Sequence, residues 1–361
     1  MKKKTIILTL TENCNLNCVY CYETNKSDKR ISLDLAKDKV IEHMKNASGV
    51  DEIEIDLFGG EPFMEFDIMR KLCAEIRLVN VNLPYVIFVN TNGTLAHGQI
   101  QEWLKRNKYV RLGLSLDGSP TTHNFNRSNS YNLIDFAFFL ENYPTQPVKM
   151  TINNNTLANL AADIIHIHDL GFKISASFAL GIDWEDVKYS KILIRELKIL
   201  SDYYLDNPHI IPCTLFSTNF LLLYLTNKPK WCGTHTYMVS IDVDGNEYPC
   251  QSFQPNTTGN KEANLPLFPE LDDWSDPECG DCLINNICSS CYGFNFMQFG
   301  DILTQDKTMC ALKKVVALAC SYYTGCLIER GKLDLTPQDM AKTIKAVNDI
   351  QDAYSKTMED L

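Results

Sequence analysis

The feature that most constrains the fold is a regular alternation of short β-branched runs with helical stretches, from residue 5 to about residue 180. Such alternation is typical of repeated βα units around a parallel sheet. Six units are counted, with strands predicted at residues 5–10, 53–57, 85–90, 110–116, 148–152 and 173–178 and a last helix near 186–206. Ser32 is the predicted N-cap of the first helix, whose apolar face carries Leu33, Ala36, Val40 and Met44. The sequence therefore predicts an α/β fold, a partial (β/α)6 barrel of the TIM type.

Cysteine, glycine and polar residues that could form an active site follow four consecutive predicted strands. They are Cys14, Cys18 and Cys21 after the first strand, Gly59, Gly60, Glu61 and Pro62 after the second, Asn92 after the third and Ser115 at the end of the fourth. The loops at the carboxyl ends of barrel strands form the active face of such folds. We therefore expect these residues to meet on one functional rim.

Beyond about residue 210 the βα alternation stops. Residues 232–310 are rich in Cys, Gly, Pro, Asn and Asp, which predicts a small domain held together by metal. The expected division is a barrel at 1–210, a linker at 211–231, the metal domain at 232–325 and a helical tail at 326–361. The stretch 232–310 has twelve acids against two lysines, so it holds almost all of the chain's net charge of −11.

Charge and cysteine usage limit the classes of function. The net charge of −11 disfavours nucleic acids and anionic membranes as partners. The apolar run near the N-terminus is shorter than the ~7 to 15 residues of a signal peptide, and no window is expected to reach the ~20 apolar residues of a membrane span. We therefore predict a cytoplasmic protein. Thiols stay reduced there, so the bunching of the fourteen cysteines favours metal over disulfides.

The first cysteine group has the spacing C-x-x-x-C-x-x-C, with Tyr20 before its last cysteine. Three thiolates leave one iron of a 4Fe-4S cluster open, whereas a structural zinc site or a self-contained cluster takes four ligands. The spacing and its place after the first strand resemble those of the radical S-adenosylmethionine enzymes. The resemblance implies that Cys14, Cys18 and Cys21 hold the cluster, that S-adenosylmethionine binds the open iron, and that an electron cleaves it to a 5'-deoxyadenosyl radical. A zinc site or buried thiols are the alternative.

The resemblance also assigns a cofactor-binding role to other residues of the rim. Gly59, Gly60, Glu61 and Pro62 match the family's G-G-E-P motif, which holds the cofactor's amino group. Glycines there are expected to let the chain approach the cofactor closely. Tyr20, Asn92, Ser115 and Arg127 lie where the family contacts the cofactor, Asn92 and Ser115 at its ribose and carboxylate and Arg127 at its carboxylate. A loop-capping hydrogen bond or a surface charge is the alternative for Asn92, Ser115 and Arg127.

The second cysteine group resembles the SPASM extension of these enzymes, which carries two auxiliary 4Fe-4S clusters, and departs from the usual spacing by one residue in its last pair. The resemblance implies an outer cluster on Cys279, Cys282, Cys288 and Cys310 and an inner cluster on Cys232, Cys250 and Cys291. The fourth inner ligand is either Cys213 or absent, and Cys213 as a buried thiol is the alternative. A zinc ribbon is the alternative for the whole region. Cys73, Cys320 and Cys326 lie on helical patterns and are expected to be core thiols.

The many acids of this region are expected to lower the reduction potentials of its clusters, unless they only form a solvated face. SPASM enzymes mostly act on peptides or proteins, which implies a ribosomally made peptide as substrate and a flavodoxin or ferredoxin as reductant. Because the cluster loop begins at Cys14, no leader-binding domain is expected ahead of the barrel.

Two kinds of enzyme fit this pattern. A peptide maturase installs a side-chain crosslink such as a Cys thioether, and an anaerobic sulfatase-maturing enzyme oxidises Cys or Ser to formylglycine. In the latter class an Asp proposed as the base follows the second SPASM cysteine, whereas Gln251 follows Cys250 here. An amide cannot accept that proton. We therefore predict a peptide maturase that forms a thioether, while epimerisation and carbon-carbon crosslinking use the same iron sites.

Overall fold

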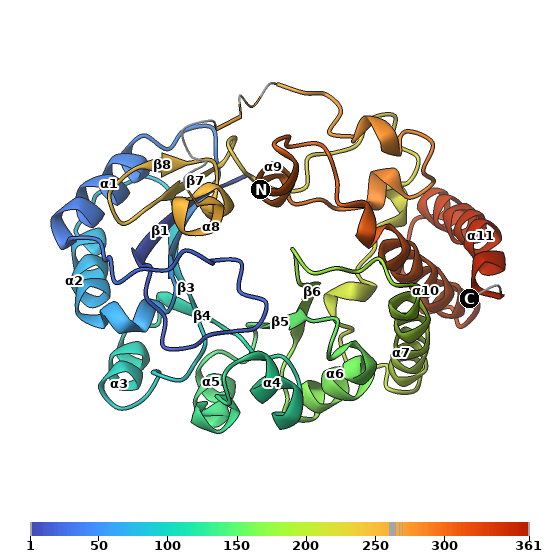
Figure 1. Ribbon diagram of the computed structural model, residues 1–361, viewed down its shortest axis with the longest axis horizontal. Coiled ribbons are helices and arrows are strands. Elements are labelled where there is room, and N and C mark those ends of the chain that lie inside the picture. The colour runs from blue at the N-terminus through green and yellow to red at the C-terminus, as the bar shows by residue number, and fades with distance from the viewer. Residues whose placement is uncertain (1, 260–264, 267, 269, 360–361) are drawn as a thin grey trace.

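The computed structural model describes residues 2–259, 265–266, 268 and 270–359, with side chains up to residue 355. All six predicted strands are present, each followed by helical structure. The strands are β1 (Lys3–Thr11), β2 (Glu52–Gly59), β3 (Tyr85–Thr91), β4 (Val110–Leu114), β5 (Val148–Ile152) and β6 (Ile174–Phe178). The helices are α1 (Leu33–Lys45), α2 (Phe66–Arg77), α3 (Gln99–Arg106), α4 (Pro120–Asn126), α5 (Phe136–Asn142), α6 (Leu160–Asp169) and α7 (Val187–Asp206). Figure 1 shows the strands along an arc with these helices on its outer side.

The strands do not form one continuous sheet. Strands β1 to β4 pair in parallel in one sheet, and β5 and β6 pair in parallel in a second. Between them, only an isolated bridge joins Ser115 to Lys149, and the Leu116 N–H donates to the Lys149 carbonyl at 2.9 Å. The predicted fourth strand thus ends at Leu114 rather than Leu116. The junction between β4 and β5 is the least hydrogen-bonded part of the arc.

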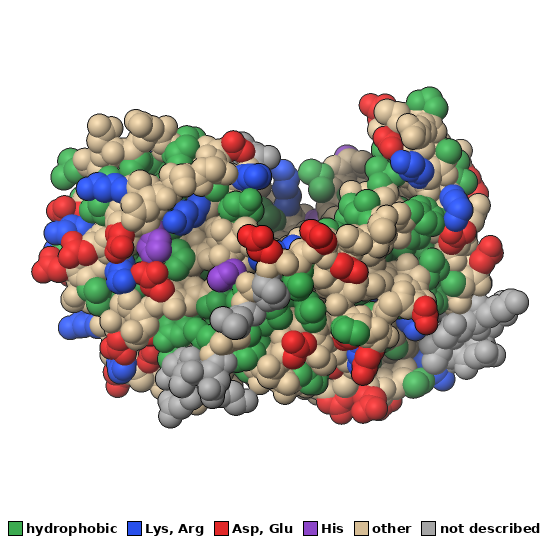
Figure 2. Space-filling view, turned by 90° about the horizontal axis from the view of Figure 1, so that it is seen from above, with side chains coloured by type: hydrophobic (Ala, Val, Ile, Leu, Met, Phe, Trp, Pro, Cys, Tyr) green, Lys and Arg blue, Asp and Glu red, His purple; other side chains and the backbone are tan. Residues whose placement is uncertain are grey.

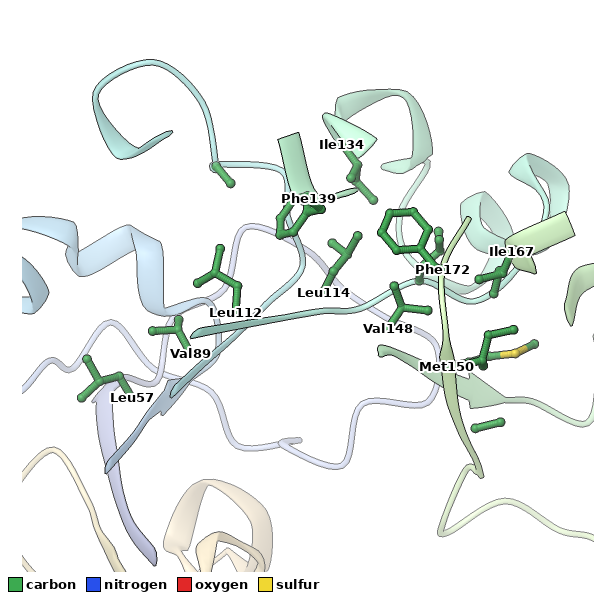
Figure 3. Close-up of a cluster of buried hydrophobic side chains, with 14 of the residues drawn as sticks. Leu57, Val89, Leu112, Leu114, Ile134, Phe139, Val148, Met150, Ile167 and Phe172 are labelled. Carbon is green, nitrogen blue, oxygen red and sulfur yellow. The ribbon is translucent and has the colours of Figure 1, made fainter. Parts of the chain in front are cut away.

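The hydrophobic core lies between the strands and the outer helices. Figure 3 shows Leu57, Val89, Leu112 and Leu114 from the strands near Ile134 and Phe139 from the outer layer. On α1, the predicted buried face is confirmed for Ala36, Val40 and Met44, whereas Leu33 is half-buried. Ser32 caps this helix, because its side chain accepts a hydrogen bond from the Leu35 N–H at 3.3 Å.

A short hairpin from the cysteine-rich part of the chain extends the barrel sheet. Strand β7 (Met238–Ile241) pairs in parallel with β1, and β8 (Glu247–Tyr248) pairs antiparallel with β7. The order of this six-stranded sheet is β4-β3-β2-β1-β7-β8. This pairing was not predicted from the sequence. It anchors the region after residue 232 directly on the first strand of the barrel.

The remaining helices complete the C-terminal part. They are α8 (Pro255–Thr258), α9 (Tyr292–Phe299), α10 (Cys310–Glu329) and α11 (Pro337–Glu359). Helix α10 packs against α7 on one side and α11 on the other (Figure 1). Within the described residues, one segment, Lys307–Glu329, is long and apolar enough to cross a membrane by length and composition. This corrects the expectation that no such window exists, although its helix packs partly into the hydrophobic core.

The surface mixes charges of both signs. On the face shown in Figure 2, Lys and Arg side chains are scattered among Asp and Glu side chains. Among the cysteines expected in the core, Cys73 and Cys320 are buried, whereas Cys326 is half-buried. The prediction that Cys326 is a core thiol was therefore wrong, because Cys326 lies near the end of α10, where one side of the helix faces solvent.

Candidate active site

The loop between β1 and α1 places its three cysteines at the mouth of the barrel. Cys14, Cys18 and Cys21 line a cavity of about 470 Å³, within the range of pockets that hold small molecules. The structure brings nearly all of the predicted rim to this cavity, which is also lined by Tyr20, Gly59, Gly60, Glu61, Asn92, Ser115 and Arg127. Pro62 is buried behind it, at the first position of a short 3-10 helix. The four strand ends therefore meet, as their position in a βα barrel requires.

Gly59 and Gly60 hold the second strand end against the cysteine loop. The Gly60 N–H donates to the Thr11 carbonyl at 3.0 Å, and the Glu61 N–H donates to the Asn13 carbonyl at 3.0 Å. A Cβ atom on Gly60 would come within 2.2 Å of the Asn13 oxygen. These glycines therefore allow a close approach to the cysteine loop, a contact that was not predicted.

The Glu61 carboxylate is buried and connects two strand ends. It accepts hydrogen bonds from the Thr91 hydroxyl and the Asn92 N–H, each at 2.8 Å, and from the Phe63 N–H at 3.2 Å. Burial raises the pKa of Glu61 to about 7, against the opposing effect of these donors. A cationic amino group entering the cavity would favour the ionised form of this carboxyl.

Asn92 and Ser115 also lie where the rim was predicted. The Asn92 side-chain amide donates to the Asn15 side chain at 2.9 Å, and its oxygen accepts from the Thr94 N–H and hydroxyl. Asn92 thus braces the cysteine loop, which fits the alternative of a loop-capping hydrogen bond. The Ser115 N–H donates to the Thr91 carbonyl at 2.9 Å, and the residue lines the cavity.

Asp117 is the site residue that the sequence analysis missed. Its carboxylate is fully buried and accepts hydrogen bonds from Tyr20, Asn126, Arg127 and the Thr151 N–H. The Arg127 guanidinium binds it in two places, Nε to Oδ2 at 2.9 Å and Nη2 to Oδ1 at 3.1 Å. Asp117 therefore ties together the cysteine loop, α4 and β5. Its signal in the sequence was a carboxylate between Leu116, the last residue of the predicted fourth strand, and a glycine.

Arg127 is predicted to bind the cofactor's carboxylate, and the structure shows that its guanidinium also pairs with Asp117. Arginine has five N–H donors, and two are used by this pair. Arg127 still lines the cavity. Its guanidinium is thus held in a fixed orientation at the cavity wall by an internal carboxylate.

The electrostatics of the cysteine loop favour protonated thiols when no metal is present. Burial raises the pKa of Cys14 to about 11 and also raises the pKa of Cys18. The charges of Lys26 and Arg127 act in the opposite direction, and Lys26 hydrogen-bonds to the Cys21 thiol. Because metal ligands must be deprotonated, iron binding at this loop releases protons and is pH-dependent.

The other predicted ligands form two separate groups. Cys232, Cys250 and Cys291 interact electrostatically with one another. Near the helix pair α10 and α11, the thiols of Cys279, Cys288 and Cys310 interact in the same way, and Cys282 follows Cys279 in a tight turn. We call these the inner trio and the outer quartet. Within the described part of the chain, no three His, Cys, Asp or Glu side chains converge as one metal ion requires.

Cys213 does not join the inner trio. It is fully buried beside Tyr204, whose hydroxyl accepts from the Cys213 N–H at 3.1 Å, and near Cys320. This environment matches the alternative of a buried thiol.

A second cavity, of about 570 Å³, adjoins the first. Both cavities are lined by Ser177, Phe178 and Leu180, and the second also reaches Cys288 and Cys291. Two buried polar atoms near these cavities have no hydrogen-bond partner within the described residues, the Oε1 atom of Gln251 and the Nε1 atom of Trp231. Together the two cavities form a mainly apolar space that runs from the cysteine loop to the C-terminal thiols.

Comparison with known proteins defines the class of this chain. Residues 8–138 match the family model of the Radical SAM superfamily. This region includes the cysteine loop and every rim residue described above. Residues 8–138 of the chain therefore form a radical SAM domain. This confirms the predicted enzyme class.

Individual relatives narrow the class. The chain is 27% identical over 278 residues to the cysteine-type anaerobic sulfatase-maturating enzyme of Clostridium perfringens, covering 69% of this chain and 74% of that protein. It is 36% identical over 118 residues to an uncharacterized protein of Methanocaldococcus jannaschii, of which the match spans 39%. The chain is thus related to sulfatase maturases, although its identity to each relative is low or limited to part of the chain.

Solved structures show the same fold. The structure of anSMEcpe with bound AdoMet superposes with a TM-score of 0.71 at 19% identity, over 95% of this chain and 98% of that chain. SuiB of Streptococcus suis, bound to the precursor peptide SuiA, superposes with a TM-score of 0.52 at 17% identity, over 85% of this chain and 76% of that one. These likenesses confirm the predicted α/β partial barrel.

Proposed function

We propose that this radical SAM enzyme is a peptide maturase. It would abstract hydrogen from a ribosomally made peptide and install a side-chain crosslink, a Cys thioether. The two joined cavities support a substrate larger than a metabolite, because they extend from the cysteine loop past Phe178 to Cys291. SuiB, which shares the fold, is described with a bound precursor peptide.

The first cavity would hold the cluster on Cys14, Cys18 and Cys21 and S-adenosylmethionine beside it. When bound, this pair supplies the 5'-deoxyadenosyl radical. The chain's own residues position it: Glu61 offers a carboxylate to the amino group, and Ser115 and Arg127 offer donors from the opposite wall. Asn92 and the Gly60 backbone keep the cysteine loop in place.

The thioether proposal rests mainly on the position of Cys213. Cys213 is packed against Tyr204, so the inner trio has three thiols and no fourth among the described cysteines. A cluster held by three thiols supplies one open ligand position, which a substrate thiol can take. Thioether formation would remove one hydrogen atom from carbon, which the 5'-deoxyadenosyl radical would take. It would also remove one proton and one electron from the substrate thiol, the proton passing to solvent and the electron to an auxiliary cluster. Cys291 of the trio lines the cavity that a peptide would occupy.

Gln251 gives a second reason to favour crosslinking. It lines the first cavity, and its Oε1 atom has no partner among the described residues. This side chain can accept a hydrogen bond from a substrate amide, but it cannot act as a base. Glu12 and Glu23 each lie two residues from a cysteine of the loop. Glu23 lines the first cavity, accepts a hydrogen bond from the Asn256 amide at 3.0 Å, and has a pKa that burial raises to about 7.

Sulfatase maturation is the second candidate. It is favoured by the similarity to the Clostridium perfringens enzyme, which extends over 69% of this chain. Epimerisation and carbon-carbon crosslinking would use the same cavities. In all these cases we propose a flavodoxin or ferredoxin as reductant, two auxiliary clusters on the inner trio and outer quartet, and a cytoplasmic location.

Mass spectrometry of substrates distinguishes the candidates. The enzyme is co-expressed anaerobically with each short peptide encoded near its gene and, separately, with a sulfatase-derived peptide. A thioether maturase removes two hydrogens per site and makes the peptide thiol resistant to alkylation. Conversion of a sulfatase Cys to an aldehyde would refute the thioether proposal and assign sulfatase maturation.

A variant with Cys14, Cys18 and Cys21 all changed to Ala is the matched control. It should form no 5'-deoxyadenosine and should still contain the auxiliary iron. Continued formation of 5'-deoxyadenosine would overturn the assignment of the first cluster. A Cys73→Ala variant, which removes a buried thiol outside all three groups, should keep the activity.

A further inference from the structure

The thiols of the outer quartet contact side chains that donate hydrogen bonds. The Lys307 ammonium donates to the Cys279 sulfur at 3.2 Å. Tyr354, on α11, makes a side-chain hydrogen bond with Cys282. The Cys288 thiol donates to the side-chain oxygen of Gln305 at 3.7 Å, so Gln305 is an acceptor there. Two of the four thiols, Cys279 and Cys282, thus have a side-chain donor within contact distance.

Buried positive charge adds to these donors. Lys228 is 1% exposed, and its ammonium donates to the Asn285 side chain at 3.3 Å while facing Cys279 and Cys288. Lys313 faces Cys310 and donates to the Ser289 carbonyl at 2.8 Å. The outer quartet is therefore surrounded by lysines, despite the acidity of this stretch of chain.

Two acids near the outer quartet are paired with one of these lysines. Asp276, which is 2% exposed, lies 2.7 Å from the Lys307 ammonium, and the exposed Glu278 lies 3.5 Å from it. Asp276 also accepts from the Gln305 N–H at 2.8 Å. These contacts hold Lys307 in place against Cys279.

The surroundings of the inner trio differ. Its sulfurs accept mainly from the backbone, Cys232 from the Thr234 N–H and Cys250 from the Ser252 N–H, with a further bond from the Thr234 hydroxyl. Among the described residues, Lys230 is the cation that faces this group. Within that part of the chain, the inner trio has fewer cationic neighbours than the outer quartet.

We propose that Lys307 and Tyr354 are positioning residues that raise the reduction potential of the 4Fe-4S cluster held by the outer quartet. Adding an electron adds negative charge to a cluster, and hydrogen bonds to its sulfurs and nearby cations stabilise that charge. The outer cluster then accepts an electron more readily than the inner one. The many acids of this region predicted a lower reduction potential. The outer cluster differs because the side chains nearest to it, which include lysines, determine the local electrostatic field. The inference rests on the proposed function only in requiring that the outer quartet holds a cluster.

Tyr354 also gives the C-terminal helix a role. Helix α11 packs on α10, and Tyr354 joins a hydrophobic cluster that includes Cys282, Leu283 and Ile287. The Lys314 ammonium lies 5.6 Å from the centre of the Tyr354 ring. Helix α11 therefore covers the outer quartet and supplies one of its donors.

Redox titration followed by electron paramagnetic resonance tests the inference without any peptide. The starting protein is the full chain with Cys14, Cys18 and Cys21 changed to Ala, which should show the signals of the auxiliary clusters alone. The signal that is lost when Cys279→Ala is added is assigned to the outer cluster. The comparison is made at the potential where half of the outer cluster is reduced in the starting protein. At that potential, Lys307→Met should lower the ratio of reduced to oxidised outer cluster about tenfold, which corresponds to a midpoint potential lower by ~59 mV for one electron. Tyr354→Phe should lower it about threefold.

Two variants serve as matched controls. Tyr322→Phe removes a hydroxyl that hydrogen-bonds to Cys326, which belongs to neither group, and Lys345→Met removes a lysine that pairs with Asp349 on α11. Neither should move the outer midpoint. Unchanged midpoints in Lys307→Met and Tyr354→Phe, at normal iron content, overturn the inference. If Lys307→Met fails to retain iron, Tyr354→Phe decides, because it keeps the ring packing. Full iron content in Cys279→Ala, with no signal lost, refutes the outer cluster itself.

Discussion

Replacing Asp117 by Asn tests whether the buried Asp117 carboxylate holds the cysteine loop to the barrel. The substitution keeps the shape of the side chain but removes the charge that faces Arg127, and it places an N–H group among donors. The carboxylate is 0% exposed and the Arg127 side chain 9%, so solvent cannot replace the lost partner. Removing one member of a buried ion pair costs ~3 to 5 kcal/mol. We expect a loss of this size in the free energy of unfolding.

The measurement is urea unfolding of the metal-free protein, carried out anaerobically as a double-mutant cycle with Arg127→Met. If the two charges stabilise each other, Asp117→Asn should cost much less in the Arg127→Met background than alone. Asp202→Asn, which removes the carboxylate from an exposed pair with Lys198, should have little effect. A loss below ~1 kcal/mol for Asp117→Asn, equal in both backgrounds, would refute the reasoning.

Three further predictions concern pH, the cysteine loop and the inner trio. Burial lowers the pKa of His123 to about 4. The folded protein therefore loses ~3 kcal/mol of stability as the pH falls from 6.5 towards 4, because the unfolded chain binds a proton on His123 first. The difference between the urea midpoints at pH 5 and pH 7 should be smaller in His123→Gln than in the starting protein. Gly60→Ala should displace the cysteine loop, because its Cβ atom meets Asn13, and iron analysis should show loss of the first cluster alone. Cys213→Ala should lower stability by ~1 kcal/mol with unchanged iron content, whereas Cys291→Ala should lose iron.

The strands of the barrel could be predicted because their periodicity reflects one buried face. In β2, Ile53, Ile55 and Leu57 alternate with polar residues and are all fully buried. The rim followed from the same pattern, since parallel strands bring their carboxyl ends to one edge. The prediction of site residues was thus a consequence of predicting the strands.

Long-range pairing could not be predicted in this way. Strand β7 has four residues, too few for a period to distinguish it from a loop, and its partner lies at the other end of the chain. The role of Asp117 was hidden for a similar reason, because its partners Tyr20, Arg127 and Thr151 come from three separate elements. A single sequence reports local pattern and does not report which distant side chains meet.

The pairing of β7 with β1 has a consequence for synthesis of the chain. Thr5 pairs with Met238, so one edge of β1 has no partner until roughly 230 further residues have been made. At the usual rates of translation this takes on the order of 10 to 50 s. An unpaired strand edge is a template for aggregation. During that interval the nascent chain therefore depends on the ribosome or on chaperones to keep the edge of β1 covered, and a chain that stops before residue 238 never covers it with its own strand.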